Sequence, residues 1–129
     1  MHIIGNGVDI IKNSRINNSL KTKGFLNRIF TEKEIQQGTK LKNKINFYAK
    51  RFAAKEAFVK AIGTGFRSDI NFIDIEIKNY KNGKPYISLS KKLNNFLRKK
   101  LKIQKYKVFL SLSDEKDYSI AFVVIDKKI

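Results

Sequence analysis

The sequence of 129 residues contains no cysteine and only one histidine, and this composition excludes several kinds of catalytic and metal-binding site. Without cysteine, the chain can form no disulfide and offers no thiol as a nucleophile or a metal ligand. The histidine, His2, lies at the frayed N-terminal end, so we expect neither imidazole catalysis nor a histidine-based zinc site. A Ser-His-Asp hydrolase is excluded on the same ground.

Long apolar segments are also missing. The longest apolar run covers residues 120–125, far short of the roughly 20 residues needed to span a bilayer. The first residues carry no cationic segment and soon reach Asp9, which is not the pattern of a signal peptide. We therefore expect a cytoplasmic protein with no membrane partner.

Acidic residues are few. Lysine and arginine number 28 against 11 aspartates and glutamates, which gives a formal net charge of +17. Such an excess suggests a substrate or partner rich in negative charge. The chain is also crowded with Lys, Asn and Ile, a pattern that an AT-biased genome produces. A given surface lysine can therefore equally be drift on a solvated face, and the charge alone leaves both explanations open.

The remaining composition is that of a globular chain. Hydrophobic residues make up 42% of it, enough for the core of one domain covering residues 1–129. The segment 2–10 alternates around two glycines and is rich in Ile and Val, which predicts a strand whose end carries Asp9. Gly5 and Gly7 leave room there for another backbone or a ligand to approach.

Two helices are expected in the first half of the chain. Thr31 followed by Glu34 matches a capping box, so a helix begins at about Thr31 and breaks near Gly38. A second, longer helix covers residues 44–62. Gly63 supplies its C-terminal stop.

Two hairpins and a short helix are expected in the second half. Residues 71–78 alternate strictly and lead into an Asn82-Gly83 turn, which predicts the first hairpin. Ser90 can cap a basic helix that reaches about residue 101. The segments 106–113 and 119–125 predict the second hairpin.

The resulting order is β-α-α-β-β-α-β-β. Strands and helices are segregated rather than alternating, which predicts an α+β fold with an antiparallel sheet and packed helices.

The long helix has an unusual distribution of charge in its segment 51–65, RFAAKEAFVKAIGTG. At about 100° per residue, Lys55 projects into the apolar sector of the helix and Arg51 lies at its edge. Glu56 points the other way, where its neighbours at helical spacing are the small residues Ala49 and Ala53 together with Lys60. The apolar sector is formed by Tyr48, Phe52, Val59 and Ile62.

The chain's usable groups are carboxylates, lysines and hydroxyls, an inventory that suits a hard cation such as Mg²⁺. Asp9 and Glu56 are the candidate ligands. Each residue also has a simpler explanation when it is taken alone. Asp9 can cap a strand end, and Glu56 can form an exposed pair with Lys60 worth about 0.3 kcal/mol. Lys55 can bury its stem and send its ammonium out to water.

Five segments of the chain form a recognisable series. They are GNGVDIIKNSR, FLNRIFTEKE, RFAAKEAFVKAIGTG, NGKP and LSLSDEKDYSIAFVVI. Their central signature is G-x-D with an arginine six residues after the aspartate, followed by R-x-x-x-K-E-A. In order and spacing, the series resembles the holo-acyl-carrier-protein synthases, the small bacterial 4′-phosphopantetheinyl transferases.

The resemblance implies the phosphopantetheinyl transferase fold and a reaction. The family moves the phosphopantetheine arm of coenzyme A onto a serine of apo-acyl carrier protein, for fatty-acid biosynthesis, and releases adenosine 3′,5′-bisphosphate. It further implies Mg²⁺, with Mn²⁺ as a substitute, and a homotrimer whose sites lie between subunits.

The resemblance also implies roles for the residues of the long helix. Asp9 and Glu56 look like the magnesium ligands, and Glu56 is the candidate base for the serine. Lys60 is placed to neutralise the leaving phosphate. Arg51 and Lys55 could reach other phosphate oxygens or the interior of the site.

Three further segments receive roles from the resemblance. Backbone N–H groups of Gly63-Thr64-Gly65 would lie close to the pyrophosphate. Gly83-Lys84-Pro85 resembles the family's segment beside the adenosine end. Arg15 and Arg28 resemble the basic surface that meets the acidic carrier protein.

One position departs from the family pattern. Many members have histidine where this chain has Asp114, which reverses the local charge.

One other class of protein is an alternative. A basic RNA-binding domain without catalysis would also suit a charge of +17. No RNP-like aromatic motif, KH loop or zinc module is present, so we expect no nucleic-acid partner.

Overall fold

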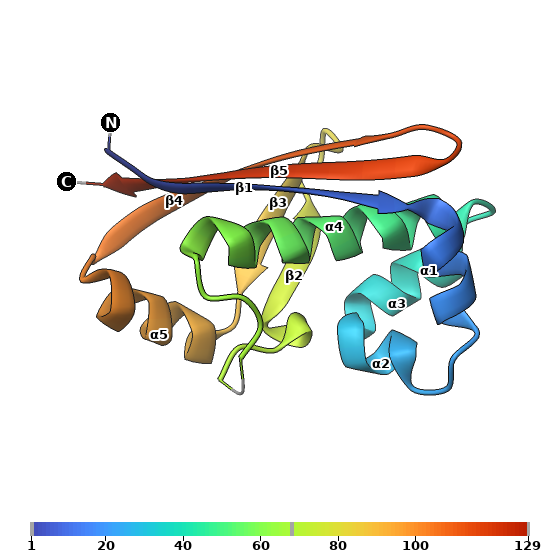
Figure 1. Ribbon diagram of the computed structural model, residues 1–129, viewed down its shortest axis with the longest axis horizontal. Coiled ribbons are helices and arrows are strands. Elements are labelled where there is room, and N and C mark those ends of the chain that lie inside the picture. Colours follow the sequence, from blue (N-terminus) through green and yellow to red (C-terminus); the bar gives the residue numbers. More distant parts are fainter. Residues whose placement is uncertain (1, 68, 129) are drawn as a thin grey trace.

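Strand β1 (His2–Lys12) and helix α4 (Lys44–Ile62) form the centre of the computed structural model, which describes residues 2–67 and 69–128. Figure 1 shows α4 lying along one face of the sheet that contains β1. A Cβ atom at Gly7 would collide with the carbonyl oxygen of Ala57, and one at Gly5 with that of Ala61. The two glycines therefore admit the helix backbone, as the sequence predicted, because any larger residue would push α4 away from β1.

The main sheet has the strand order β1-β5-β4 and is antiparallel throughout. Strands β4 (Lys105–Asp114) and β5 (Tyr118–Lys128) form the C-terminal hairpin that the sequence predicted. Residues of β5 alternate strictly between the two faces. Ala121, Val123 and Ile125 are buried on the side of α4, whereas Ile120 and Phe122 face outward.

A second, two-stranded sheet is formed by β2 (Ile75–Asn79) and β3 (Pro85–Leu89), and β3 packs beside β4. This hairpin and its Asn82-Gly83 turn confirm the prediction from sequence. The predicted strand began too early, however, because residues 72–74 form a 3₁₀ turn. The Asn71 N–H donates to the Asp74 carboxylate at 3.0 Å and closes that turn, which the alternating pattern does not reveal.

Two helices that were absent from the predicted order follow β1. They are α1 (Asn13–Leu20) and α2 (Phe25–Ile29). Helix α1 has no side-chain cap at its N-terminus, so it lacks the local signal that marks a helix start. Its first residue, Asn13, is buried and donates its side-chain amide to the carbonyls of Glu115 and Lys116. The β4–β5 turn, about a hundred residues away, therefore fixes where α1 begins.

The predicted helices α3 (Glu32–Thr39) and α5 (Lys91–Leu101) are confirmed with their caps. Helix α3 ends at Thr39, one residue after Gly38, which confirms the predicted break near this glycine. A Cβ atom at Gly38 would collide with the Tyr48 ring, so this glycine serves the contact between α3 and α4. Helices α1 to α3 gather at one end of α4, and α5 lies at the other (Figure 1).

The buried side chains form one continuous cluster between α4, the inner face of the main sheet, the β2–β3 hairpin and the shorter helices. The α+β class predicted from the sequence is confirmed. Within residues 2–67 and 69–128, no helix combines the length and the apolar character needed to cross a membrane.

Candidate functional site

Asp9, Glu56 and Lys60 meet where β1 crosses α4, and we call them the carboxylate cluster. Alternation along β1 turns Gly7, Asp9 and Ile11 toward the helix. The Lys60 Nζ donates to Asp9 Oδ1 at 3.0 Å and to the Val8 carbonyl at 2.9 Å. Its ammonium thus contacts Asp9 rather than forming the pair with Glu56 that the sequence offered as a simpler explanation.

Glu56 is half-buried beside Asp9. Burial raises the pKa of the Glu56 carboxyl, the negative charge of Asp9 raises it further, and Lys60 acts in the opposite direction. An added positive charge beside Asp9 and Glu56 would favour the ionised form of the Glu56 carboxyl. The cluster is therefore poised electrostatically for a cation.

The donor set of the cluster fits Mg²⁺. Across the described part of the chain, no three His, Cys, Asp or Glu side chains are grouped so that they could hold a metal ion. A cation at Asp9 and Glu56 would have two protein carboxylates and would take its other ligands from water and substrate. Mg²⁺ is commonly bound in this way, with one or two carboxylates plus substrate phosphates.

Lys55 is directed away from the cluster and is completely buried. Its Nζ donates to Glu34 Oε1 at 2.7 Å, to the Ile29 carbonyl at 2.7 Å and to the Phe72 carbonyl at 3.3 Å. The three N–H donors of the ammonium are thereby used inside the protein. Lys55 neither extends to water nor remains available to a phosphate, so we withdraw it from the predicted cofactor-binding residues.

Arg51 is also buried, with 4% of its surface exposed. Its Nη2 donates to Asn79 Oδ1 at 2.8 Å, and its guanidinium lies 3.8 Å from the centre of the Phe47 ring. Arg51 therefore points toward the β2–β3 hairpin, and we find no contact that brings it to the carboxylate cluster among the described residues.

The Gly63-Thr64-Gly65 segment leaves the C-terminus of α4 with two left-handed residues, Gly63 at φ 78° and Gly65 at φ 65°. The Gly63 N–H is used by the helix end, since it donates to the Val59 and Lys60 carbonyls. The prediction that this segment presents N–H groups to a phosphate therefore applies only to the N–H groups of Thr64 and Gly65.

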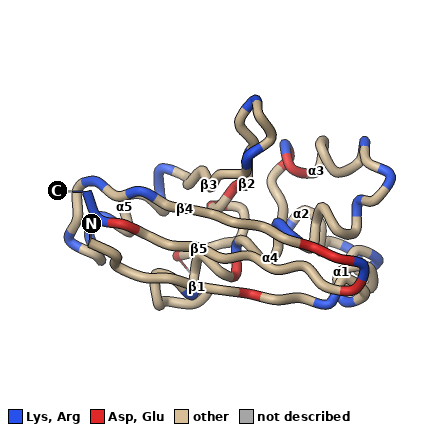
Figure 2. Tube along the Cα trace, turned by 90° about the horizontal axis from the view of Figure 1, so that it is seen from above, with Lys and Arg blue, Asp and Glu red and all other residues tan. Residues whose placement is uncertain are grey.

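The Gly83-Lys84-Pro85 segment lies at the tip of the β2–β3 hairpin. Because the sheet order is β1-β5-β4 and β3 packs beside β4, this tip and Asp9 lie at opposite edges of the sheet. Figure 2 shows β1 along one edge and the hairpin beyond the other. A single chain does not bring these two parts of the predicted site together.

Asp114, the position that departs from the family pattern, is neutralised within the chain. Its carboxylate accepts a hydrogen bond from Asn46 Nδ2 at 2.8 Å and lies 3.3 Å from Lys50 Nζ. No local pattern indicates these partners, because they stand 68 and 64 positions earlier in the chain. The negative charge at Asp114 is therefore balanced by the first turns of α4.

Arg15 and Arg28, the predicted carrier-protein contacts, are both exposed. They stand on α1 and α2, two short helices that pack against each other. Both guanidinium groups are therefore available to a partner on the same end of the molecule.

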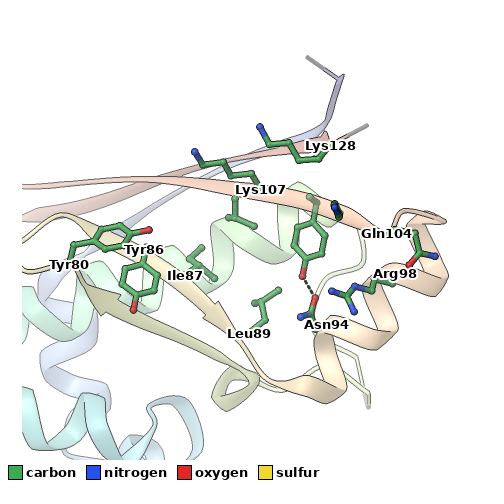
Figure 3. Close-up of a pocket in the computed structure, with 12 residues that line it drawn as sticks. Tyr80, Tyr86, Ile87, Leu89, Asn94, Arg98, Gln104, Lys107 and Lys128 are labelled. Carbon is green, nitrogen blue, oxygen red and sulfur yellow. Dashed lines mark hydrogen bonds between the residues drawn. The ribbon is translucent and has the colours of Figure 1, made fainter.

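A cavity of about 550 Å³ lies between the β2–β3 hairpin, α5 and β4 (Figure 3). The stacked rings of Tyr80 and Tyr86, 4.3 Å apart, form one wall. The other walls carry amide groups and cations, and no carboxylate belongs to the described lining. None of these residues was predicted from the sequence, where only the tyrosines flanking the Asn82-Gly83 turn could have signalled them. The cations are Arg98, Lys105, Lys107 and Lys128.

The sequence pattern of the 4′-phosphopantetheinyl transferase superfamily matches residues 5–123, which include the carboxylate cluster and the hairpin tip. The chain belongs to this superfamily. Holo-[acyl-carrier-protein] synthase of Pelagibacter ubique is 52% identical over 128 residues, covering 99% of this transferase and 100% of that protein.

Solved structures resemble the transferase over almost its whole length. A holo-(acyl-carrier-protein) synthase from Bacillus anthracis in complex with CoA (3′,5′-ADP) has a TM-score of 0.82 at 37% identity, covering 99% of this chain and 100% of that one. The synthase from Neisseria meningitidis has a TM-score of 0.86 at 40% identity, covering 97% and 99%. The fold predicted from the resemblance is therefore confirmed.

Proposed function

We propose that this transferase moves the 4′-phosphopantetheine group of coenzyme A onto a serine of apo-acyl carrier protein and releases adenosine 3′,5′-bisphosphate. The observation that carries the proposal is the carboxylate cluster, in which Asp9, Glu56 and Lys60 lie together on β1 and α4 within the part of the chain that matches the superfamily. A cytoplasmic location and a place in fatty-acid biosynthesis go with this proposal. The family match favours it over the basic RNA-binding domain.

The reaction forms a bond from the serine oxygen to phosphorus and breaks the bond between that phosphorus and the bridging oxygen of the pyrophosphate. Negative charge develops on the leaving phosphate, so positioning and charge neutralisation are the main requirements. Lys60 is more than half exposed beside Asp9 and supplies a cation there. Mg²⁺ or Mn²⁺, held by Asp9 and Glu56, would supply further positive charge for the pyrophosphate oxygens.

The serine must also lose its proton, because a free hydroxyl is a weak nucleophile. Glu56 is the proposed acceptor, directly or through a water molecule. Its half-buried carboxylate lies next to Asp9 and Lys60, where the proposed cation would bring the serine and the pyrophosphate together.

Mass spectrometry of apo-acyl carrier protein incubated with the transferase, coenzyme A and Mg²⁺ tests the proposal. We expect the carrier protein to gain the mass of one phosphopantetheine group at its serine. A carrier protein of unchanged mass after long incubation with folded transferase would contradict the proposed reaction.

The exposed arginines of α1 and α2 support a docking surface for an acidic carrier protein. We expect Arg15→Glu to raise the Michaelis constant for the carrier protein strongly at low salt and that for coenzyme A little, because exposed charges steer the encounter. Steady-state kinetics at two salt concentrations measure this effect. Charge reversal at Lys99 on α5 is the control, and equal losses from both reversals would show that the α1–α2 surface is not the docking face.

A homotrimer with sites between subunits is supported by two observations. The predicted site segments lie at opposite edges of the sheet in one chain, so a second copy would be needed to complete a site. The outer face of the main sheet is also apolar and uncovered. Its exposed residues are Val8, Ile10, Phe109, Tyr118, Ile120 and Phe122.

The transferase should therefore have the mass of a trimer in light scattering. Phe122→Glu should give an inactive monomer. Association would bury the new carboxylate in the centre of an apolar interface, and the loss of its hydration would not be compensated by an opposite charge. Ile73→Glu is the matched control: its side chain is 50% exposed on the 3₁₀ turn, away from the sheet, and the variant should remain assembled. An active wild-type monomer would exclude the trimer.

A further inference from the structure

A polar relay joins the middle of α4 to the tip of the β2–β3 hairpin. Arg51 Nη2 donates to Asn79 Oδ1 at 2.8 Å, and Asn79 Nδ2 donates to the Gly83 carbonyl at 2.9 Å. Asn79 is the last residue of β2 and stands immediately before the turn. The relay therefore connects a helix residue to a turn residue through one amide side chain.

The orientation of the Asn79 amide is determined by its two neighbours. A guanidinium can only donate hydrogen bonds, so the amide oxygen must face Arg51. The amide nitrogen then faces the Gly83 carbonyl, which can only accept. Arg51 is itself held in place, since it is buried and its guanidinium lies against the Phe47 ring.

The turn at residues 80–84 is closed by its own hydrogen bonds. The Tyr80 N–H donates to the Lys84 carbonyl, and the Gly83 N–H donates to the Tyr80 carbonyl, both at 2.9 Å. The Lys84 N–H donates to Asn82 Oδ1 at 3.0 Å. Gly83 has φ 89°, a conformation that glycine adopts without strain. A turn closed in this way moves as a unit, and its placement depends on how it is attached to the rest of the molecule.

We propose that Asn79 is a positioning residue for nucleotide binding: through Arg51 it fixes the Gly83-Lys84-Pro85 segment relative to α4. The inference rests on the proposed function and on the resemblance, which implies that this segment lies beside the adenosine end of coenzyme A. It also gives Arg51 a role that differs from the predicted direct contact with phosphate. Holding a binding segment in its bound position before the ligand arrives lowers the entropic cost of binding.

Asn79→Ala removes both hydrogen bonds of the relay. Because the two bonds act in series as one tether, the Michaelis constant for coenzyme A should rise by about 3- to 10-fold, the range that corresponds to the net contribution of one hydrogen bond. The kcat should stay within about twofold, because the carboxylate cluster is unchanged. Hydrogen exchange should become faster in peptides that contain residues 80–84 and should not change elsewhere. Asn95→Ala, an exposed asparagine on α5, is the matched control and should change neither quantity.

A double-mutant cycle with Arg51→Lys separates positioning from direct binding. If Arg51 acts through Asn79, Arg51→Lys should raise the Michaelis constant for coenzyme A in the wild-type background and have little further effect in Asn79→Ala. Additive effects of the two substitutions would overturn the relay. In that case, Arg51 would act on coenzyme A binding independently of Asn79.

The wild-type protein distinguishes failure of the relay from failure of the proposed function. Wild-type transferase that neither modifies the carrier protein nor binds coenzyme A in calorimetry would overturn both. An active wild type whose Michaelis constant for coenzyme A is unchanged in Asn79→Ala would overturn the relay alone.

Discussion

Glu56→Gln lowers the rate of transfer by roughly two to four orders of magnitude, the usual contribution of a general base, while the fold stays intact. The substitution keeps the size of the side chain but removes the charge that a cation needs and the group proposed to take the serine proton. Initial rates across a Mg²⁺ titration measure the loss, and circular dichroism measures the fold. Asp9→Asn should behave in the same way, since Asp9 supplies the other carboxylate of the cluster.

Stability should not fall with activity in Glu56→Gln. Burial and the charge of Asp9 raise the pKa of Glu56, so its ionised form is disfavoured in the folded protein. Removing that charge should leave the melting temperature unchanged or raise it. Glu32→Gln, at an exposed glutamate on α3, is the control and should change neither rate nor stability.

Metal dependence belongs to the same prediction. Activity should disappear with a chelator and return with Mg²⁺ or Mn²⁺, because Asp9 and Glu56 are oxygen ligands. Full activity in either carboxylate variant, or in the presence of a chelator, would remove the metal site from the proposal.

Lys55→Met should lower the free energy of unfolding by about 3–5 kcal/mol, the cost of leaving a buried charge without its partner. Glu34 is fully buried and its Oε1 accepts hydrogen bonds from Lys55 and from the Thr31 N–H. Its Oε2 accepts the Ile77 N–H at 3.0 Å. The pair thus joins α3, α4 and β2, and its loss leaves the Glu34 carboxylate uncompensated.

Urea denaturation at fixed protein concentration measures this loss. Adding Glu34→Gln to Lys55→Met should restore part of the stability, because the unpaired charge is removed. Lys99→Met, at an exposed lysine, should have little effect. If Lys55→Met left stability unchanged and raised only the Michaelis constant for coenzyme A, then Lys55 would be a ligand of the substrate after all.

Only the local part of the buried Glu34–Lys55 pair could be predicted from the sequence. The capping box at Thr31 and Glu34 was predicted correctly, because it depends on residues three positions apart. The second bond of Glu34, to a lysine 21 positions later, has no local pattern. Helical periodicity placed Lys55 in the apolar sector correctly, yet it could not show that a carboxylate is buried opposite it.

The carboxylate cluster shows the same division. The alternation of residues 2–10 predicted a strand with Asp9 at its end. The strand is confirmed, but it continues past Asp9 to Lys12, because β1 stays paired with β5 up to the β4–β5 turn. The resemblance implied that Asp9 and Glu56 act together. The contact between Asp9 and Lys60 spans 51 positions and depends on which face of β1 meets α4. Gly5 and Gly7 decide that face, because the carbonyls of Ala57 and Ala61 leave no room for a Cβ atom.

The sequence by itself determined the chemistry that this protein can use and most of its local structure. The missing thiols and the single terminal histidine excluded whole classes of site, and caps, glycine stops and alternation defined elements from neighbouring residues. Only the tertiary structure decided where the polar groups of α4 are directed: Lys55 into the core, Arg51 to Asn79, and Glu56 toward Asp9. The reason is physical. A hydrogen bond within one turn depends on residue types a few positions apart, whereas a partner tens of positions away is set by how strands and helices pack.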